Sequence, residues 1–286
     1  MFEVILMDAK AYAEQASEIF VLSDSFIRIK DLIDDEASTI DDIADVILLD
    51  PALSATVLKL ANSSFFNYPG KIDTISKAVL VLGITEVYNL VIAHFTAKAF
   101  ESISADAEYL TQFWEKSVDC ALIIKQLALQ LNVPRGERLF ILGLLHNLGE
   151  LVVKQISPDK VADIYEDLEI YPWLREQETL GFTFGECTAH LLQCWRLPIS
   201  LVEPIKQQDN QSGDYSINDV NLLYVAKRVM AKNTFFPKMF YQEVVNEELY
   251  EGMGLDKKAF DDALKVCDLE RFDVLAILNP GAAMIY

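Results

Sequence analysis

The sequence predicts an all-α fold. Apolar residues recur with helical periodicity along almost the whole chain, and no stretch alternates apolar and polar residues between hairpin turns. With 286 residues, of which 52% are hydrophobic, the chain can bury a large core. Short breaks containing proline, glycine or asparagine separate the periodic stretches, as is typical of compact helix joints. We therefore expect one large helical domain or two closely packed lobes.

The first helices are predicted from their starting signals. One helix is expected over residues 25–34, and Thr39 is the expected N-cap of the next, because a side-chain oxygen can accept the free N–H groups of a first turn. Pro51 suits the first turn of a third helix, since it has no N–H to satisfy there. Asp50, directly before it, is the expected cap.

The next helices are predicted from their ends. Asn62 is expected to tie the end of the third helix to a neighbouring backbone through its amide. A helix over residues 74–82 should end at Gly83, because glycine readily adopts the conformation that terminates helices. Thr85 is then the expected cap of the helix that follows.

The second half of the chain predicts longer helices. We expect a helix over residues 110–131 and a buried helix over residues 138–156, which includes the apolar run before His146. On this second helix Asn147, Glu150 and Lys154 would form a polar stripe. Proline-containing breaks follow, and the remaining helices are expected at about 217–232 and 257–266.

Charge and composition exclude several classes of protein. The formal net charge is −20, which repels phosphate backbones, so nucleic-acid binding is not expected. Residues 31–50 carry eight acids and no Lys or Arg, which indicates the solvated faces of amphipathic helices more than a site for a basic partner. The longest apolar runs are too short to span a bilayer, and the first residues lack a basic leader. The four cysteines suit a reducing compartment, so we expect a cytoplasmic protein.

Three blocks of sequence, in this order, resemble the HDOD family, the HD-related output domain proteins of bacterial signalling, which are relatives of the HD and HD-GYP metal-dependent phosphohydrolases. The blocks contain Asp50-Pro51, Asn62-Ser63 and Gly83; then Trp114, Gly143, His146, Asn147 and Gly149; and then Glu178, Trp195 and Pro198.

The resemblance implies a two-lobed helical HDOD fold, with an N-terminal helical bundle and a C-terminal lobe derived from the HD core. The expected boundaries are an N-terminal helical segment at 1–19, an HDOD domain at 20–216 and a C-terminal helical extension at 217–286. Within the HDOD domain the N-terminal lobe would cover 20–108 and the HD-like lobe 109–216. Asp50 and Asn62 would then serve mainly as scaffold residues.

The resemblance also allows the metal ligands of HD enzymes to be sought position by position. Such enzymes hold a cation with His and Asp side chains from several helices and use it to activate water. The expected ligand positions here hold other residues: Lys116 for the first His, His146-Asn147 for the His-Asp pair, Phe184 for a later His, and Gln207-Gln208 for a terminal His-His. We therefore expect a vestigial site, no catalytic residue, no bound metal and no cofactor.

Several roles remain open for these residues. His146 is predicted to hydrogen-bond across the core of its lobe. The less favoured alternative is a ligand pocket without metal, formed by Lys116, His146, Asn147, Gln207 and Gln208. Cys187, His190 and Cys194 share one predicted helix face, but donors along one straight helix seldom converge on a zinc ion, so simple packing is favoured.

These observations favour a non-catalytic regulatory protein over an enzyme. It would act by binding a signalling protein or a small ligand, and its oligomeric state is left open. The first rival interpretation is a metal-dependent phosphohydrolase with an atypical ligand set. The second is a module that binds a nucleotide or another small signal.

Overall fold

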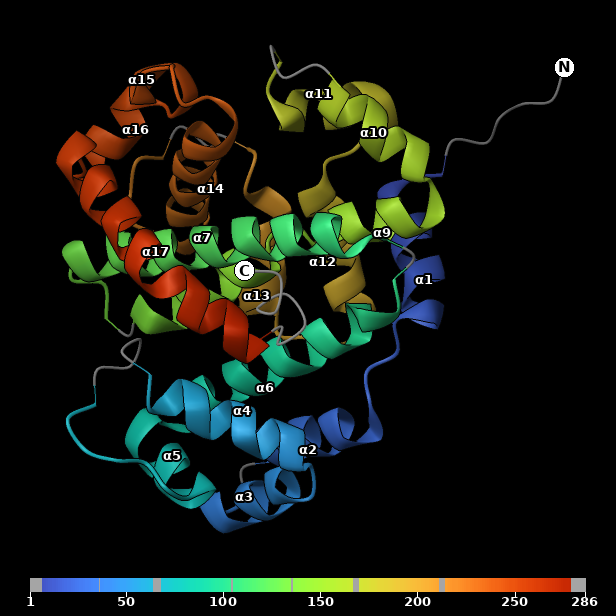
Figure 1. Ribbon diagram of the computed structural model, residues 1–286, viewed down its shortest axis with the longest axis vertical. Helices are drawn as coiled ribbons and strands as arrows, with labels where there is room; N and C mark the ends of the chain where they lie inside the picture. Colours follow the sequence, from blue (N-terminus) through green and yellow to red (C-terminus); the bar gives the residue numbers. More distant parts are fainter. Residues whose placement is uncertain are drawn as a thin grey trace, which may run out of the picture.

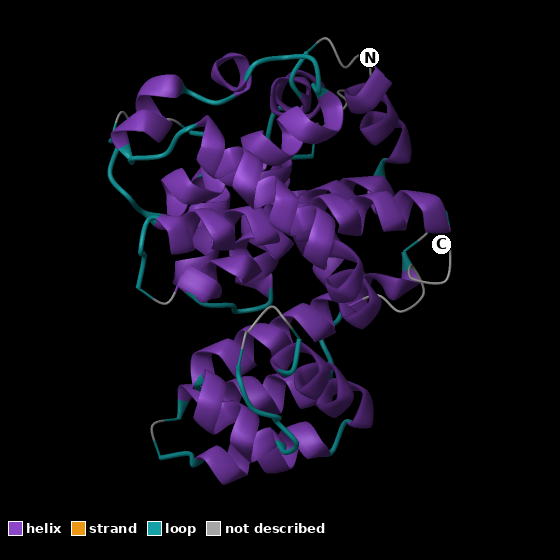
Figure 2. Ribbon diagram, turned by 60° about the vertical axis from the view of Figure 1, so that its left-hand side comes forward, coloured by secondary structure: helices purple, strands orange, loops and turns teal. Residues whose placement is uncertain are grey.

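The computed structural model describes residues 7–35, 37–63, 68–103, 105–134, 136–166, 170–210 and 214–278. Within these ranges the secondary structure is helical and contains no strand, which confirms the predicted fold class (Figure 2). Residues 1–6 of the expected N-terminal segment and residues 279–286 of the expected C-terminal extension lie outside the described residues. The helices are α1 Ala9–Ile19, α2 Asp24–Asp34, α3 Ile40–Leu48, α4 Pro51–Ala61, α5 Ile75–Leu82, α6 Ile84–Ala99, η1 Phe100–Ser102, α7 Ala107–Gln130, η2 Gly136–Arg138, α8 Leu139–Leu145, α9 Leu148–Ile156, α10 Pro158–Glu166, α11 Pro172–Leu180, α12 Phe184–Cys194, α13 Ile199–Gln207, α14 Asp219–Phe235, α15 Tyr241–Val244, α16 Glu247–Gly252 and α17 Lys257–Leu278.

The helices form two groups that are joined through α6 and α7. Helices α2 to α5 lie together with α6 at one end of the molecule, and most of the later helices surround α7 at the other (Figures 1 and 2). The first helix, α1, packs against α9 and α12, so it belongs in space with the later helices. The last helix, α17, lies along α7 and ties the C-terminal segment to the centre of the molecule (Figure 1).

The capping signals read from the sequence operate as predicted in the N-terminal half. Thr39 forms a capping box with Asp42 at the start of α3. The carboxylate of Asp50 accepts the N–H groups of Ala52 and Leu53, each at 3.0 Å, and Pro51 begins α4. These interactions span three residues or fewer, which is why the local sequence was enough to predict them.

Asn62 ties the end of α4 to the next segment, as expected. Its Nδ2 donates to the carbonyls of Leu58 at 2.7 Å and Ile72 at 2.6 Å, and its Oδ1 accepts the N–H of Ile72 at 2.8 Å. The neighbouring Ser63 hydroxyl donates to the carbonyl of Leu60. The two residues therefore close the helix and fix the chain that follows it.

The joint between α5 and α6 differs from the prediction. Gly83 ends α5 with φ of +92°, as expected for a glycine. Thr85, however, does not cap α6, because that helix already begins at Ile84 and Gly83 is its N-cap residue. The turn is tighter than predicted and leaves no room for a separate capping residue.

Among the described residues, the apolar stretch Leu139–Ile156 is long enough by length and composition to cross a bilayer, and the bent pair Ile75–Leu82 and Ile84–Ser102 passes the same test only if it is taken as one span. The stretch Leu139–Ile156 comprises α8 and α9, and 78% of it is buried inside the molecule. Burial of this kind is typical of a core element. Gly143 permits it to pack closely, because a Cβ at this position would lie 2.4 Å from the Cα of Ala121 on α7.

Candidate functional site

The predicted buried helix over 138–156 is in fact two helices that break at His146-Asn147. α8 ends at Leu145 and α9 begins at Leu148, while Asn147 has φ of −124° and ψ of 20°. Its Nδ2 donates to Oε2 of Glu150 at 2.7 Å. An asparagine side chain that bonds to a neighbouring group competes with regular helix, which accounts for a break that the apolar periodicity did not reveal.

Glu150 is the centre of a buried hydrogen-bond network. Its side chain is fully buried and accepts four hydrogen bonds from groups on three other segments. The donors are Tyr109 at 2.8 Å, Tyr165 at 2.8 Å, Asn147 at 2.7 Å and the Lys116 Nζ at 3.3 Å. The predicted polar stripe is therefore wrong for this residue, because Glu150 points into the protein and holds a satisfied charge.

The two phenols that donate to Glu150 keep their protons. Burial raises the pKa of the Tyr165 and Tyr109 phenols, and the negative charge of Glu150 raises it further. Lys116 approaches Glu150 beside two rings, with its Nζ 4.9 Å from the centre of the Tyr165 ring and 5.6 Å from that of Phe235. An ammonium group beside a carboxylate and aromatic faces is stabilised as a cation.

A second buried acid, Asp209, has two cationic partners from α14. The Lys227 Nζ lies 2.8 Å and 3.0 Å from its two carboxylate oxygens, and Arg228 approaches within 3.5 Å. Burial raises the pKa of Asp209, but the charges of Lys227 and Arg228 outweigh it and hold the pKa below its usual value. Arg228 also stacks on Tyr224 and lies 4.4 Å from the centre of the Trp173 ring. Sequence reasoning missed all of these residues.

His146 is buried and neutral. Its Nδ1 bonds to the carbonyl of Gly143 at 2.6 Å, one turn earlier, so the predicted bond across the lobe core is not formed. Burial lowers the pKa of the imidazole to about 3, with a further contribution from Lys227. Because Nδ1 then carries the proton, Nε2 is an acceptor, and it has no hydrogen-bond partner among the described residues.

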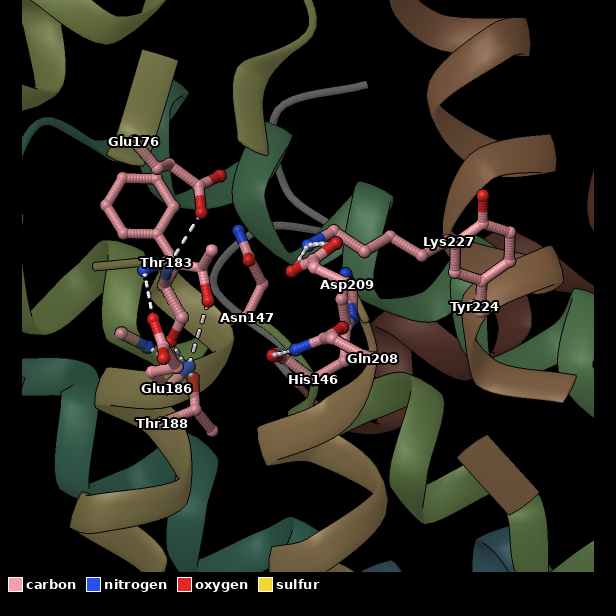
Figure 3. Close-up of polar contacts among 12 residues, drawn as sticks. His146, Asn147, Glu176, Thr183, Glu186, Thr188, Gln208, Asp209, Tyr224 and Lys227 are labelled. Atoms are coloured by element: carbon pink, nitrogen blue, oxygen red, sulfur yellow. Dashed lines mark hydrogen bonds and ion pairs between the residues drawn. The ribbon is translucent and has the colours of Figure 1, made fainter. Parts of the chain in front are cut away.

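Some of these groups line one small cavity between α7, α9, α11 and α14, whereas Asp209 and Arg228 lie outside its wall. Its volume is about 30 Å³, and Lys116, His146, Asn147, Glu150 and Lys227 are among the residues in its wall. Such a volume holds about two water molecules. Figure 3 shows Asn147 between Glu176 and the Asp209–Lys227 pair.

Glu176 contributes a second acid to the cavity wall. It is buried, and its Oε2 accepts the N–H of Phe184 at 2.7 Å. Burial raises its pKa to about 7, although Lys227 acts in the opposite direction. This side chain is thus the group of the site that changes its protonation near neutral pH.

The structure brings together only part of the predicted ligand pocket. Lys116, His146 and Asn147 line the cavity, whereas Gln207 lies at the surface and donates to Glu203. Gln208 is buried behind the cavity wall and donates to the backbone carbonyl of His146 at 2.8 Å (Figure 3). Phe184 is also buried outside the cavity wall, at the start of α12. The prediction of Gln207 as a pocket residue is therefore wrong, because the side chain faces the opposite side of α13.

The remaining family positions serve the packing of the lobe. A Cβ on Gly149 would lie 2.2 Å from the carbonyl oxygen of Phe184, so only glycine permits this contact. The Trp195 indole N–H donates to the carbonyl of Phe20 at 3.0 Å, and Pro198 precedes α13. Trp114 is buried on α7, while Glu178 is exposed and pairs with Arg175.

The cysteine and histidine positions on α12 do not form a site together. Cys187 is buried, His190 is partly exposed and bonds to Gln193, and Cys194 is exposed. Their side chains therefore face different surroundings.

The residues present do not fit a divalent metal ion. The two charged carboxylates beside the cavity, Glu150 and Asp209, are already neutralised by lysine ammonium groups that would repel a cation. Asn147 supplies a neutral amide where HD enzymes use a carboxylate. Across the part of the chain that the structure describes, no group of three or more His, Cys, Asp or Glu side chains could hold a metal ion.

Comparisons with known proteins agree with this architecture. Residues 19–211 match the family model of the HDOD domain. A crystal structure of a candidate phosphohydrolase from Shewanella amazonensis SB2B is similar with a TM-score of 0.68 and 25% identity, covering 96% of this chain and 98% of that one. An HDOD domain protein of unknown function from Geobacter sulfurreducens gives a TM-score of 0.65 at 18% identity, covering 95% and 98%.

Two further relatives are longer than this chain, which spans only part of each. A candidate signal transduction protein from Marinobacter aquaeolei VT8 gives a TM-score of 0.66 at 22% identity, covering 99% of this chain and 68% of that one. An uncharacterized protein from Treponema pallidum (strain Nichols) is 27% identical over 210 residues, which is 71% of this chain but only 40% of that protein. Because the family model matches more than half of its length, the chain belongs to the HDOD domain family.

Proposed function

We propose that this chain is a non-catalytic regulatory module of a bacterial signalling system, located in the cytoplasm, that acts by binding another protein or a small ligand. The observation that carries this proposal is the network around Glu150. A carboxylate that would have to be free to bind a metal or to move a proton instead accepts four hydrogen bonds, one of them from Lys116. The name of the Marinobacter aquaeolei relative, a signal transduction protein, is consistent with this role.

The small volume of the cavity favours binding of a protein partner over binding of a small ligand. A volume of about 30 Å³ is far below the roughly 300 Å³ or more of a pocket for a drug-sized ligand. A nucleotide would therefore have to open the contacts of Lys116 and Lys227 before it could enter. A protein partner would bind the outer surface and leave these contacts intact.

The alternative activity is metal-dependent phosphohydrolysis, which is supported by the name of the Shewanella amazonensis relative. The test is a turnover screen of the purified protein with phosphomonoesters, nucleotides and cyclic dinucleotides, in the presence of Mn²⁺ or Mg²⁺. We expect no turnover above background for the wild type, and no change in His146→Ala.

His190→Ala is the matched control, because His190 lies on the surface of α12, outside the cavity wall. Turnover that disappears in His146→Ala and persists in His190→Ala would contradict the proposal and establish the hydrolase.

A thermal-shift screen separates the two binding modes. A small ligand that binds only the folded state raises the midpoint of unfolding. We expect nucleotides to produce no shift, and we expect a signalling protein such as a kinase, receptor or cyclase to co-purify from the native cell. A saturable shift with one nucleotide would instead favour the small-signal module.

A further inference from the structure

Two acids at the site are paired with lysines: Glu150 lines the cavity, and Asp209 lies next to it and also pairs with Arg228. Glu150 on α9 pairs with Lys116 on α7 at 3.3 Å, and Asp209, the second residue after α13, pairs with Lys227 on α14 at 2.8 Å. The side chains of both acids are at most 11% exposed. Removing Lys116 would leave the buried Glu150 without its cation, and removing Lys227 would leave Asp209 with only the more distant Arg228 at 3.5 Å, so both changes should be strongly destabilising.

The surroundings of Lys116 are those of a binding site for an organic cation. The ammonium group lies against the carboxylate of Glu150 and near the faces of two stacked rings, Tyr165 and Phe235, whose centres are 5.8 Å apart. A carboxylate and aromatic faces both attract an ammonium group, and aromatic faces are used by proteins to bind ammonium ligands such as choline. Here the amine belongs to the protein.

Lys227 comes from a part of the chain that the family match does not cover. The HDOD match ends at residue 211, whereas α14 begins at Asp219. Asp209 lies within the match, so the acid belongs to the HDOD domain and its lysine partner to the following segment. Phe235, one of the two rings beside Lys116, also lies on α14. The segment after the domain thus completes the cavity.

We propose that this cavity is a binding site for primary ammonium groups, permanently occupied by the Nζ atoms of Lys116 and Lys227. Lys116 supplies the positive charge beside Glu150, and Lys227, together with Arg228, supplies it beside Asp209; both of the latter residues lie on α14. This inference rests on the proposed function, because a site that already contains two lysine ammonium groups cannot also hold a catalytic metal cation. It adds the chemical class of the occupant and the segment that supplies it.

The test is chemical rescue. Lys116→Ala and Lys227→Ala each remove the atoms equivalent to n-propylamine, so we measure their thermal midpoints with added n-propylammonium chloride and, separately, with 1-propanol. We expect each variant to unfold several degrees below the wild type. We expect n-propylammonium to restore part of the loss in a saturable manner and 1-propanol to restore none.

Lys265→Ala is the matched control, because the Lys265 side chain is 72% exposed and pairs only with Asp262 on the same helix. It should lose no more than about a degree and should not respond to the amine. If Lys116→Ala and Lys227→Ala resemble this control, or if propanol restores them as well as the amine does, the proposal is wrong.

A second pair of variants covers the case in which an alanine variant fails to fold. At either lysine, substitution by Met keeps a side chain of similar length but removes its charge, whereas substitution by Arg keeps the positive charge. Chemical denaturation should find the Arg variants closer to the wild type than the Met variants, and the reverse order would overturn the proposal.

The two proposals fail separately. An inert wild type whose lysine variants are not rescued by the amine contradicts the cation site alone. Rescue in a protein that hydrolyses phosphoesters contradicts the regulatory function alone.

Discussion

At the scale of single residues, Asn147 departs further from the ligand pattern expected of a metal-dependent hydrolase than His146 does. Its amide donates to Glu150, which a carboxylate at the same position could not do. The amide therefore serves the network and is not simply a weakened ligand. The imidazole of His146, by contrast, is held by its own turn and would keep the same bond in either context.

We expect Asn147→Asp to destabilise the protein without conferring metal binding. The new carboxylate would face Glu150 in a buried site, and like charges at that distance should cost on the order of 3 kcal/mol. Urea denaturation and metal analysis after incubation with Mn²⁺ test this. Asn233→Asp, at an exposed position, is the control. One bound Mn²⁺ with a gain in stability would show that the site is ready for metal.

The raised pKa of Glu176 predicts that the free energy of unfolding depends on pH. Its pKa is raised from 4.5 to about 7 by burial, so the folded state binds the proton more tightly than the unfolded chain does. Its contribution is fully present below about pH 4.5 and is lost as the pH rises through about 7. The pKa of His146 is lowered from 6.5 to about 3, so its contribution is lost as the pH falls below about 6.5. The two effects oppose each other between about pH 4.5 and 6.5.

Glu176→Gln isolates the first of these effects. Relative to the wild type, the variant should gain on the order of 2 kcal/mol of unfolding free energy between about pH 5 and about pH 8, measured by urea denaturation. Glu178→Gln is the control, because Glu178 lies on the same helix with its side chain 59% exposed. Parallel profiles for Glu176→Gln and the wild type would mean that Glu176 is already ionised at the lower pH.

At the scale of helices, the close approach of α8 to α7 sets the position of the site. Gly143 permits this approach, and a methyl group there would lie 2.4 Å from the Cα of Ala121. We expect Gly143→Ala to cost about 2–3 kcal/mol because backbone must move to make room. Gly252→Ala, on the exposed helix α16, should cost much less. Equal thermal midpoints for the two variants would contradict the predicted strain between α7 and α8.

At the scale of helices, the sequence predicts features that depend on nearby residues but not those that depend on distant ones. The caps at Thr39 and Asp50 and the helix tie at Asn62 depend on neighbours within about ten residues, so their residue types indicate their roles. The partners of Glu150 lie up to 41 residues away, and Lys116 gives no local sign that it pairs with this acid. The break at Asn147 was hidden because the apolar periodicity continues on both sides of it.

At the scale of the whole molecule, the chain joins an HDOD domain to a segment that takes part in the core of that domain. α17 lies along α7, and Arg271 on α17 binds both carboxylate oxygens of Asp119 on α7. The family resemblance predicted the HDOD domain, which the family match over residues 19–211 confirms. It could not anticipate Lys227 or Phe235, because these residues lie beyond the segment that the family shares.

The central claim is that the cavity holds no metal ion. The most direct test is the metal content of freshly purified wild-type protein, measured by inductively coupled plasma mass spectrometry. The structure gives the acids of the cavity lysine partners, so we expect far less than one equivalent of any transition metal per chain. One equivalent that persists through dialysis, and that is lost in His146→Ala but retained in His190→Ala, would contradict the account and identify the cavity as a metal centre.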